Sequence, residues 1–119
     1  MKIDDQFRVL VVEDEALISM LIEDMLADIG CKQVDVAPSV EAALDALKKS
    51  APDFAMLDIN LNGTRSFPVA DALASRDIPF VFLSGYGAQG LDQPYREARV
   101  LQKPFQLGEL ENCLERALG

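Results

Sequence analysis

The sequence has 119 residues, 50% of them hydrophobic, with 11 Lys and Arg against 20 Asp and Glu, which gives a net charge of −9. A chain of this length buries one core and is too short for two ordinary domains, so we predict a single domain over residues 1–119. The negative charge repels phosphate backbones and anionic lipid headgroups, which argues against direct binding of nucleic acid.

Cysteine and histidine usage narrows the chemistry further. The chain has no histidine, and its two cysteines, Cys31 and Cys113, are far apart in the sequence. A zinc site and a Cys-His nucleophile are therefore excluded, and we expect two reduced thiols. Residues 1–15 carry acids on both sides of a short apolar run, unlike a secretory signal, and no stretch reaches the length of a membrane span. We predict a cytoplasmic protein without membrane insertion.

Short apolar runs alternate with helical patterns along the chain. Strands are predicted at 8–12, 33–37, 53–58, 78–84 and 99–102. Helices are predicted over 16–29, 38–49, around 68–75 and after Pro104, while the glycines of 85–96 allow at most a short fourth helix. This alternation predicts an α/β, doubly wound parallel sheet covered by helices on both faces.

The first predicted helix has a clear apolar stripe, which we expect to face the core. The stripe consists of Leu17, Ile18, Leu21, Ile22, Met25 and Ile29. Gly30 is placed to end this helix.

Polar residues follow the predicted strands, where the ligand site of an open parallel sheet lies. They are Glu13 and Asp14, Asp58 and Asn60, Ser84, and Lys103. Crowded carboxylates repel each other unless a cation is present, and hard oxygen ligands suit Mg²⁺. With Mg²⁺ and Lys103 offsetting three carboxylates, the site could accept a phosphoryl group, and one carboxylate could act as a nucleophile and form an aspartyl phosphate.

The stretch GYGAQG, residues 85–90, has the Gly-x-Gly-x-x-Gly spacing of a dinucleotide-binding loop. Such a loop belongs after the first strand and opens a helix, whereas this stretch follows the fourth predicted strand. The first strand is followed by Glu-Asp-Glu, which would repel a pyrophosphate. We interpret the glycines as giving a loop the freedom to close over a phosphoryl group.

Four motifs occur in a specific order: VLVVEDE at 9–15, MLDIN at 56–60, FLSG at 82–85 and QKPF at 102–105. Together they make the chain resemble the receiver domains of two-component response regulators, over nearly its whole length. The resemblance implies a flavodoxin-like (βα)5 fold, with a parallel sheet in the order 2-1-3-4-5 and five helices.

The resemblance also implies a role for each motif residue. Asp58 would be the phosphoacceptor and Asp14 a direct Mg²⁺ ligand, with Glu13 acting mainly through a metal-bound water. Asp58 and the main-chain carbonyl of Asn60 would complete the metal ligands. Ser84 and Lys103 would contact the phosphoryl group, and the bond before Pro104 would be cis.

The chain departs from the common receiver pattern at two places. Val100 stands where many receivers have an aromatic switch residue, and the loop after Asp58 reads NLNG without the frequent proline. The stretch FLSGYG, together with Val100 and QKPF, is similar to the mostly stand-alone subfamily named for its Phe-Ala-Thr-Gly-Gly/Tyr loop. We hypothesise that Tyr86 and the loop containing Gly85 make the signalling movement in place of that aromatic residue.

The function implied by the resemblance is phosphorylation of Asp58 by a histidine kinase or histidine phosphotransfer protein, with relay to a downstream protein by direct contact. Self-catalysed phosphotransfer and autodephosphorylation would be its only chemistry. A phosphatase using an aspartate nucleophile is the enzyme alternative, but Asn60 occupies the acid-base position and an amide does not shuttle protons. The other alternative is an interaction module that works without phosphorylation, against which the intact, mutually repelling acidic positions count.

Overall fold

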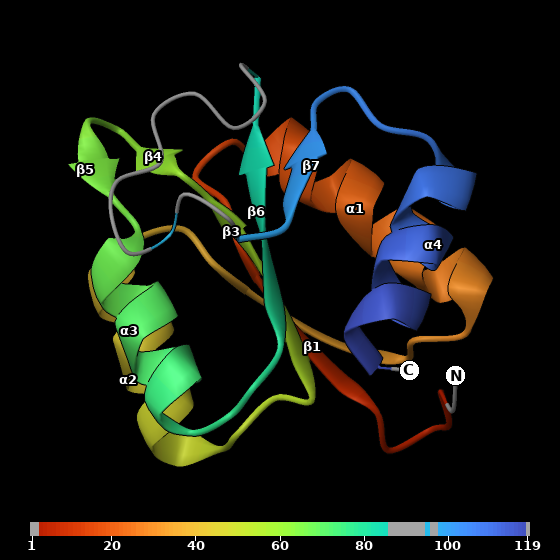
Figure 1. Cartoon of the computed structure of the whole chain (residues 1–119), viewed down its shortest axis with the longest axis horizontal. Coiled ribbons are helices and arrows are strands. Elements are labelled where there is room, and N and C mark those ends of the chain that lie inside the picture. The colour runs from red at the N-terminus through yellow and green to blue at the C-terminus, as the bar shows by residue number, and fades with distance from the viewer. Residues whose placement is uncertain (1–2, 86–94, 96–97, 119) are drawn as a thin grey trace.

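The computed structural model describes residues 3–85, 95 and 98–118. Its main sheet consists of β1 (Arg8–Val12), β2 (Gln33–Ala37), β3 (Phe54–Asp58), β6 (Phe80–Ser84) and β7 (Val100–Gln102). The strands lie in the order β2-β1-β3-β6-β7, and every neighbouring pair is parallel (Figure 1). Counted within this sheet alone, the order is 2-1-3-4-5, so the predicted topology is confirmed.

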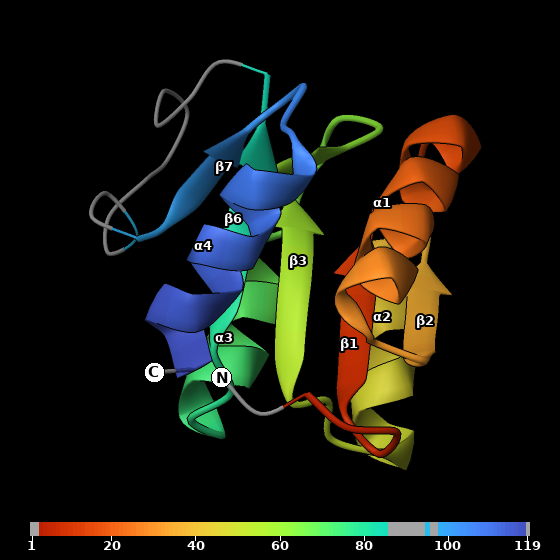
Figure 2. The ribbon, with the colours of Figure 1, turned by 90° about the vertical axis from the view of Figure 1, so that its right-hand side faces the viewer.

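Helices cover both faces of this sheet. One face carries α2 (Val40–Lys49) and α3 (Phe67–Ser75), and the other carries α1 (Ala16–Ile29) and α4 (Leu107–Leu118), as Figure 1 and Figure 2 show from two sides. The helix α4 is the one that the sequence places last, after Pro104. The short helix expected between residues 85 and 96 falls almost entirely outside the described residues.

The helix ends follow their sequence signals. The Ser39 hydroxyl accepts a hydrogen bond of 3.1 Å from the N–H of Ala42 and so caps α2. Gly30 has a φ of 113°, a left-handed conformation that suits glycine, and its N–H donates to the carbonyls of Leu26 and Ala27. These two ends fix where the chain leaves α1 and enters α2.

The core has two layers, one on each side of the sheet. In β1, Val9 and Val11 pack into the layer under α1 and α4, while Leu10 and Val12 pack into the layer under α2 and α3. Successive strand residues point to opposite faces, so a strand covered on both sides reads as a continuous apolar run. The central strand β3 is buried throughout, which makes the sheet a firm support for the residues at its end.

The expectation that the whole apolar stripe of α1 lies in the core is wrong. Leu17 is 77% exposed, Met20 59% and Leu21 60%. The buried residues of this helix are Ser19, Ile22 and Leu26, which share one side. At 3.6 residues per turn, position 17 falls opposite position 26, and position 21 is turned well away from it, so α1 presents apolar side chains to solvent as well as to the sheet.

The segment after β3, expected as a loop, contains a small antiparallel hairpin. It is formed by β4 (Asn60–Leu61) and β5 (Thr64–Arg65), joined through Asn62 and Gly63. Both joining residues have positive φ, 51° and 86°, which Asn and Gly adopt at low cost. The Asn60 side-chain oxygen accepts a 2.8 Å hydrogen bond from the N–H of Gly63, so the turn is closed locally.

Candidate functional site

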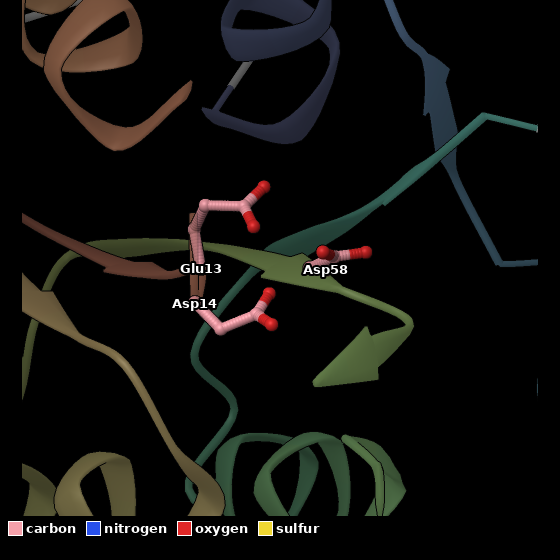
Figure 3. Close-up of side chains that lie close together, drawn as sticks. All are labelled: Glu13, Asp14 and Asp58. Atoms are coloured by element: carbon pink, nitrogen blue, oxygen red, sulfur yellow. The ribbon is translucent and has the colours of Figure 1, made fainter. Parts of the chain in front are cut away.

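Three carboxylates meet beyond the ends of two neighbouring strands. Asp58 is the last residue of β3, and Glu13 and Asp14 directly follow β1, which pairs with β3 in parallel. One carboxylate oxygen from each residue lies within 4.8 Å of the other two. Figure 3 shows the three carboxylates directed toward a common space. The acidic cluster predicted from the sequence is therefore formed.

Main-chain hydrogen bonds fix two of these carboxylates. The N–H of Glu13 donates to the carbonyl of Ala37 at 3.1 Å, which extends the pairing of β1 with β2 by one residue. The Glu13 carboxylate accepts from the N–H of Glu15 at 3.2 Å, and the Asp58 carboxylate accepts from the N–H of Asn60 at 3.4 Å. Both side chains are buried, and Asp14 is half-buried.

Lys103 brings a positive charge into the cluster. Its ammonium lies 3.1 Å from Oε1 of Glu13 and 3.4 Å from Oδ2 of Asp58. The main-chain N–H of Lys103 also donates to the carbonyl of Ser84 at 2.8 Å, which ties the residue after β7 to the end of β6. The Lys103-Pro104 bond is cis, as the resemblance implied.

The electrostatics of the cluster are those of crowded, poorly solvated charges. Burial, followed by the neighbouring charge of Asp58, raises the pKa of Glu13 to about 7. Burial alone would lower the pKa of Lys103, but its hydrogen bond to Glu13 and the charges of Asp58 and Glu13 outweigh that effect and raise it. Fully ionised, the three carboxylates carry −3 and Lys103 carries +1, so the four groups sum to −2. A divalent cation with a preference for oxygen ligands fits that charge.

Ser84 and Asn60 flank the acidic cluster. Ser84 ends β6, next to β3 in the sheet, and is 6% exposed. The N–H of Ile59 donates to the carbonyl of Leu83 at 3.2 Å, which holds the chain beyond Asp58 against the end of β6. Asn60 is exposed, and its side-chain oxygen accepts a hydrogen bond within the hairpin turn.

The residues expected to carry a signalling movement have different outcomes. Val100 begins β7, pairs with Phe82 and is half-buried against the layer under α2 and α3. Apart from Gly85 and its two chain neighbours, no described atom lies within 4 Å of the position that a Cβ on Gly85 would take, so the described residues leave room for a side chain there. Tyr86 lies outside the described residues, and its role stays a prediction.

An apolar groove lies beside the acidic cluster. It has a volume of about 330 Å³ and runs between α1 and the chain that links β7 to α4. It is lined by Ile18, Leu21, Ile22, Met25, Lys103, Pro104 and Phe105. The exposed Leu17 and Met20 belong to the same helix. Lys103 thus borders both the groove and the carboxylates.

Two features of this region were missed in the sequence analysis. The exposure of Leu17 and Leu21 could have been found by a helical projection anchored on Leu26, because Leu17 falls opposite Leu26 and Leu21 is turned well away from it. The second feature is Tyr95, which contacts three other aromatic rings. The glycine-rich sequence before it gives no periodic pattern from which such a contact could be predicted.

Comparison with known proteins agrees with this geometry. The family described as "Response regulator receiver domain" matches residues 9–115, which is most of the chain and includes all four motifs. The chain is a receiver domain. Among curated relatives, this receiver is 31% identical over 116 residues to the transcriptional regulatory protein PdtaR of Mycobacterium tuberculosis. The match covers 94% of the receiver but only 57% of PdtaR, so the receiver spans little more than half of that relative.

Solved structures show the same fold. The solution structure of SdrG from Sphingomonas melonis is 41% identical, with a TM-score of 0.84, and the match covers 95% of this receiver and 97% of SdrG. The receiver domain of the sensor histidine kinase PA1611 from Pseudomonas aeruginosa was solved with a magnesium ion in its active-site cleft; it is 25% identical, with a TM-score of 0.77 and coverage of 95% and 98%. Receiver domains therefore bind Mg²⁺ in their acidic active site, and they work as signalling proteins in two-component phosphorelays.

In the part of this receiver that the structure describes, no helix has both the length and the apolar character needed to cross a membrane.

Proposed function

We propose that this receiver accepts a phosphoryl group on Asp58 from a phosphohistidine of a histidine kinase or phosphotransfer protein, in a Mg²⁺-dependent reaction, and relays the signal by protein contact. The observation that carries the proposal is the position of Asp58. Its carboxylate lies among two other carboxylates and 3.4 Å from the ammonium of Lys103, at the carboxyl edge of a parallel sheet.

The transfer would be a displacement at phosphorus. An oxygen of the Asp58 carboxylate attacks the phosphorus, the new O–P bond forms as the N–P bond of the donor breaks, and the imidazole leaves with the bonding electrons. Lys103 would move from Asp58 to the incoming phosphoryl oxygens, a short shift because it already contacts the cluster. Ser84 would contact another phosphoryl oxygen from the end of β6. Loss of the group would follow by hydrolysis of the acyl phosphate at the same site.

The residues present fit a magnesium ion. Asp14 and Asp58 would be direct ligands, Glu13 would belong to the outer coordination sphere, and the main-chain carbonyl of Asn60 would complete the protein ligands. All of these donors are oxygens, the set that suits Mg²⁺. When bound, the ion would supply the positive charge that lets an anionic phosphoryl group approach three carboxylates.

The apolar surface beside the site supports a protein as the natural donor. Leu17, Met20 and Leu21 expose large apolar side chains on α1, and the adjoining groove is bordered by Lys103, which contacts Asp58. Exposed apolar clusters of this kind mark interaction surfaces in proteins. We infer that the phosphohistidine-bearing protein packs against α1 and the groove when its histidine reaches Asp58. For the stand-alone subfamily suggested by FLSGYG, Tyr86 and Gly85 remain the proposed switch residues.

The decisive experiment is intact-mass spectrometry after incubation with acetyl phosphate and Mg²⁺, with Asp58→Ala as the control. We expect one phosphoryl adduct on the wild-type chain and none on the variant or in the presence of a metal chelator. An adduct that persists in Asp58→Ala would contradict the assignment of the acceptor. No adduct from acetyl phosphate or from a phosphotransfer protein, together with failure to bind Mg²⁺, would instead favour an interaction module that works without phosphorylation.

A further inference from the structure

Tyr95 belongs to an aromatic cluster on the side of the sheet that α3 covers. Its ring stacks on Phe67, with centroids 5.6 Å apart and planes inclined by 17°. It meets Phe82 and Phe80 of β6 edge-on, at centroid distances of 5.6 Å and 6.1 Å. Each aromatic pair in these geometries adds stabilisation beyond the burial of its area. Tyr95 is therefore held at once by a helix and by a strand.

The hydroxyl of Tyr95 adds a directional contact to this stack. It donates a hydrogen bond to the carboxylate of Asp71, one helical turn beyond Phe67 in α3. Burial, and then the hydrogen bond and charge of Asp71, raise the pKa of Tyr95 to about 12, so the phenol remains a donor at neutral pH. Ring and hydroxyl thus both fix Tyr95 to α3.

Both supports of Tyr95 lead to the acidic site by short paths. Phe67 directly follows Ser66, whose N–H donates at 3.0 Å to the carbonyl of Ile59, the residue after Asp58. On the other side, Phe82 precedes Ser84 by two residues in β6. A shift of Ile59 or of Ser84 would therefore be passed to Phe67 or Phe82, which the Tyr95 ring contacts.

Hydrogen bonds link Tyr95 to the described residues that lead into β7. The N–H of Ala98 donates to the carbonyl of Tyr95, and the N–H of Phe82 donates to the carbonyl of Arg99, each at 3.0 Å. From there β7 pairs with β6 as far as Gln102 opposite Ser84. The placement of Tyr95 therefore sets where β7 begins and helps to set where Lys103 lies.

We propose that Tyr95 is a positioning residue for phosphoryl transfer to Asp58, a role that rests on the function proposed above. By fixing the chain that precedes β7 onto α3 and β6, it keeps Ser84 and Lys103 in register, so that both reach one phosphoryl group on Asp58. Stacking of the Tyr95 ring provides most of this attachment, and the hydrogen bond to Asp71 orients the ring. This role differs from that of the switch candidates Tyr86 and Val100, because Tyr95 contacts the elements that carry the site residues and so holds them in place and responds when they shift.

The first test compares rates of labelling by acetyl phosphate at saturating Mg²⁺. Tyr95→Leu should lower the labelling rate about three- to tenfold, because the free energy of well-packed aromatic contacts corresponds to a rate change of that size. The affinity for Mg²⁺ should stay unchanged. Tyr95→Phe keeps the ring and should restore most of the rate. Phe7→Leu is the matched control, because Phe7 is a buried ring in the core layer on the opposite side of the sheet. Its labelling rate should stay at the wild-type level.

The second test uses a spectroscopic signature. The chain has two tyrosines and no tryptophan, so Tyr86→Phe leaves Tyr95 as the single tyrosine fluorophore. Addition of Mg²⁺ and beryllofluoride, a phosphoryl mimic, should change its emission, and the change should vanish when Asp58→Ala is added to Tyr86→Phe. An emission that does not respond to occupation of the site would overturn the proposal.

The outcomes separate this proposal from the proposed function. If the wild type is labelled on Asp58 and Tyr95→Leu is labelled as fast, the positioning role is overturned and the phosphoacceptor function stands. Equal slowing in Tyr95→Leu and Phe7→Leu would also overturn it, because a general loss of packing would then explain both. If the wild type takes up no phosphoryl group from any donor, both proposals fall together.

Discussion

The ammonium of Lys103 lies 3.1 Å from Oε1 of Glu13, although the two residues are 90 positions apart in the sequence. The Glu13 side chain is fully buried and that of Lys103 is 18% exposed, so the pair is largely removed from water. The same ammonium lies 3.4 Å from Asp58. Removing one partner of such a pair leaves an uncompensated buried charge, which makes the cluster sensitive to changes at Lys103.

Replacing Lys103 by Met should therefore destabilise the metal-free protein. We expect the free energy of unfolding to fall by about 2 kcal/mol at about pH 8, because two carboxylates lose their partner. The loss should be smaller in acid, where Glu13 is protonated. Urea denaturation at both pH values measures it. Lys48→Met is the matched control: Lys48 is 80% exposed, 3.9 Å from Asp45, and its loss should change stability by less than about 0.5 kcal/mol. Equal losses in the two variants would contradict the argument.

The raised pKa of Glu13 predicts a pH dependence with a definite sign. The group titrates near 4.5 when unfolded and near 7 in the folded protein, so the fold binds this proton more tightly than the unfolded chain does. Its stabilising contribution is complete below the unfolded pKa and is lost as the pH rises through the folded pKa. Without Mg²⁺, stability should thus decline between pH 4.5 and 7 through this group.

Glu13→Gln should remove that decline, since an amide does not ionise. The variant should exceed the wild type in stability by about 1–3 kcal/mol at about pH 8 and lose this advantage in acid. Denaturation curves over a pH series without metal provide the measurement. Glu115→Gln, at an exposed position of α4, should leave the pH profile as it is. A parallel profile in Glu13→Gln and the wild type would show that Glu13 is not the group responsible.

Magnesium should stabilise the folded protein, because the carboxylate cluster exists only when the ends of β1 and β3 are side by side. At ten times the dissociation constant, a ligand that binds the native state alone adds about 1.4 kcal/mol. Thermal unfolding with and without Mg²⁺ measures the gain. It should be larger above pH 7 than below it, because the folded-state proton on Glu13 competes with the cation. Asp14→Asn should abolish the gain, and a full gain in that variant would remove Asp14 from the ligand set.

The alternation of strands and helices, and the meeting of the residues that end or follow the strands, could be predicted from local patterns, whereas the strand order came from the resemblance to receiver domains. Buried strands read as apolar runs, and parallel topology brings the residues after each run to one edge of the sheet. Glu13, Asp58 and Lys103 could thus be placed together without any knowledge of contacts. The distances between their charged atoms could not be predicted, because an ion pair between residues 13 and 103 depends on how β1, β3 and β7 are arranged in three dimensions.

The errors also have physical causes. The stripe on α1 was assigned to the core because apolar residues at helical spacing usually face inward, yet Leu17 and Leu21 lie outside. Burial of a helix position depends on which side of the helix packs against the sheet, and in α1 that is the side of Ile22 and Leu26. The hairpin after Asp58 was missed because two-residue strands have no periodicity to detect, although Asn62-Gly63 is a strong turn signal.

Tyr95 should titrate later than an ordinary tyrosine. Burial, together with the hydrogen bond and charge of Asp71, raises its pKa to about 12. In Tyr86→Phe, ultraviolet absorbance of the phenolate should follow Tyr95 alone as the pH is raised. Adding Asp71→Asn removes the negative charge and should shift this titration toward the ordinary value. Titration near pH 10 in Tyr86→Phe itself, with the fold intact by circular dichroism, would contradict the contact with Asp71.

Changes on the exposed face of α1 should slow phosphoryl transfer from a protein donor but not from a small-molecule donor. Leu17→Ser combined with Met20→Ser removes two apolar side chains that are 77% and 59% exposed, so stability should change by less than about 1 kcal/mol. Transfer from a phosphorylated histidine kinase or phosphotransfer protein should slow at least about tenfold, because the docking surface loses apolar contact area. Labelling by acetyl phosphate should keep its wild-type rate, since Asp58 and Lys103 are unchanged.

A matched pair of changes on the opposite side of the molecule serves as the control for that surface. Glu41→Ser and Asp45→Ser alter the outward side of α2, which covers the other face of the sheet, and should affect neither donor. If the α1 changes slow transfer from both donors, these changes disturb the site itself. Full-rate transfer from the protein donor would mean that its histidine reaches Asp58 without contact to α1, and that the groove beside Lys103 is used by a different partner.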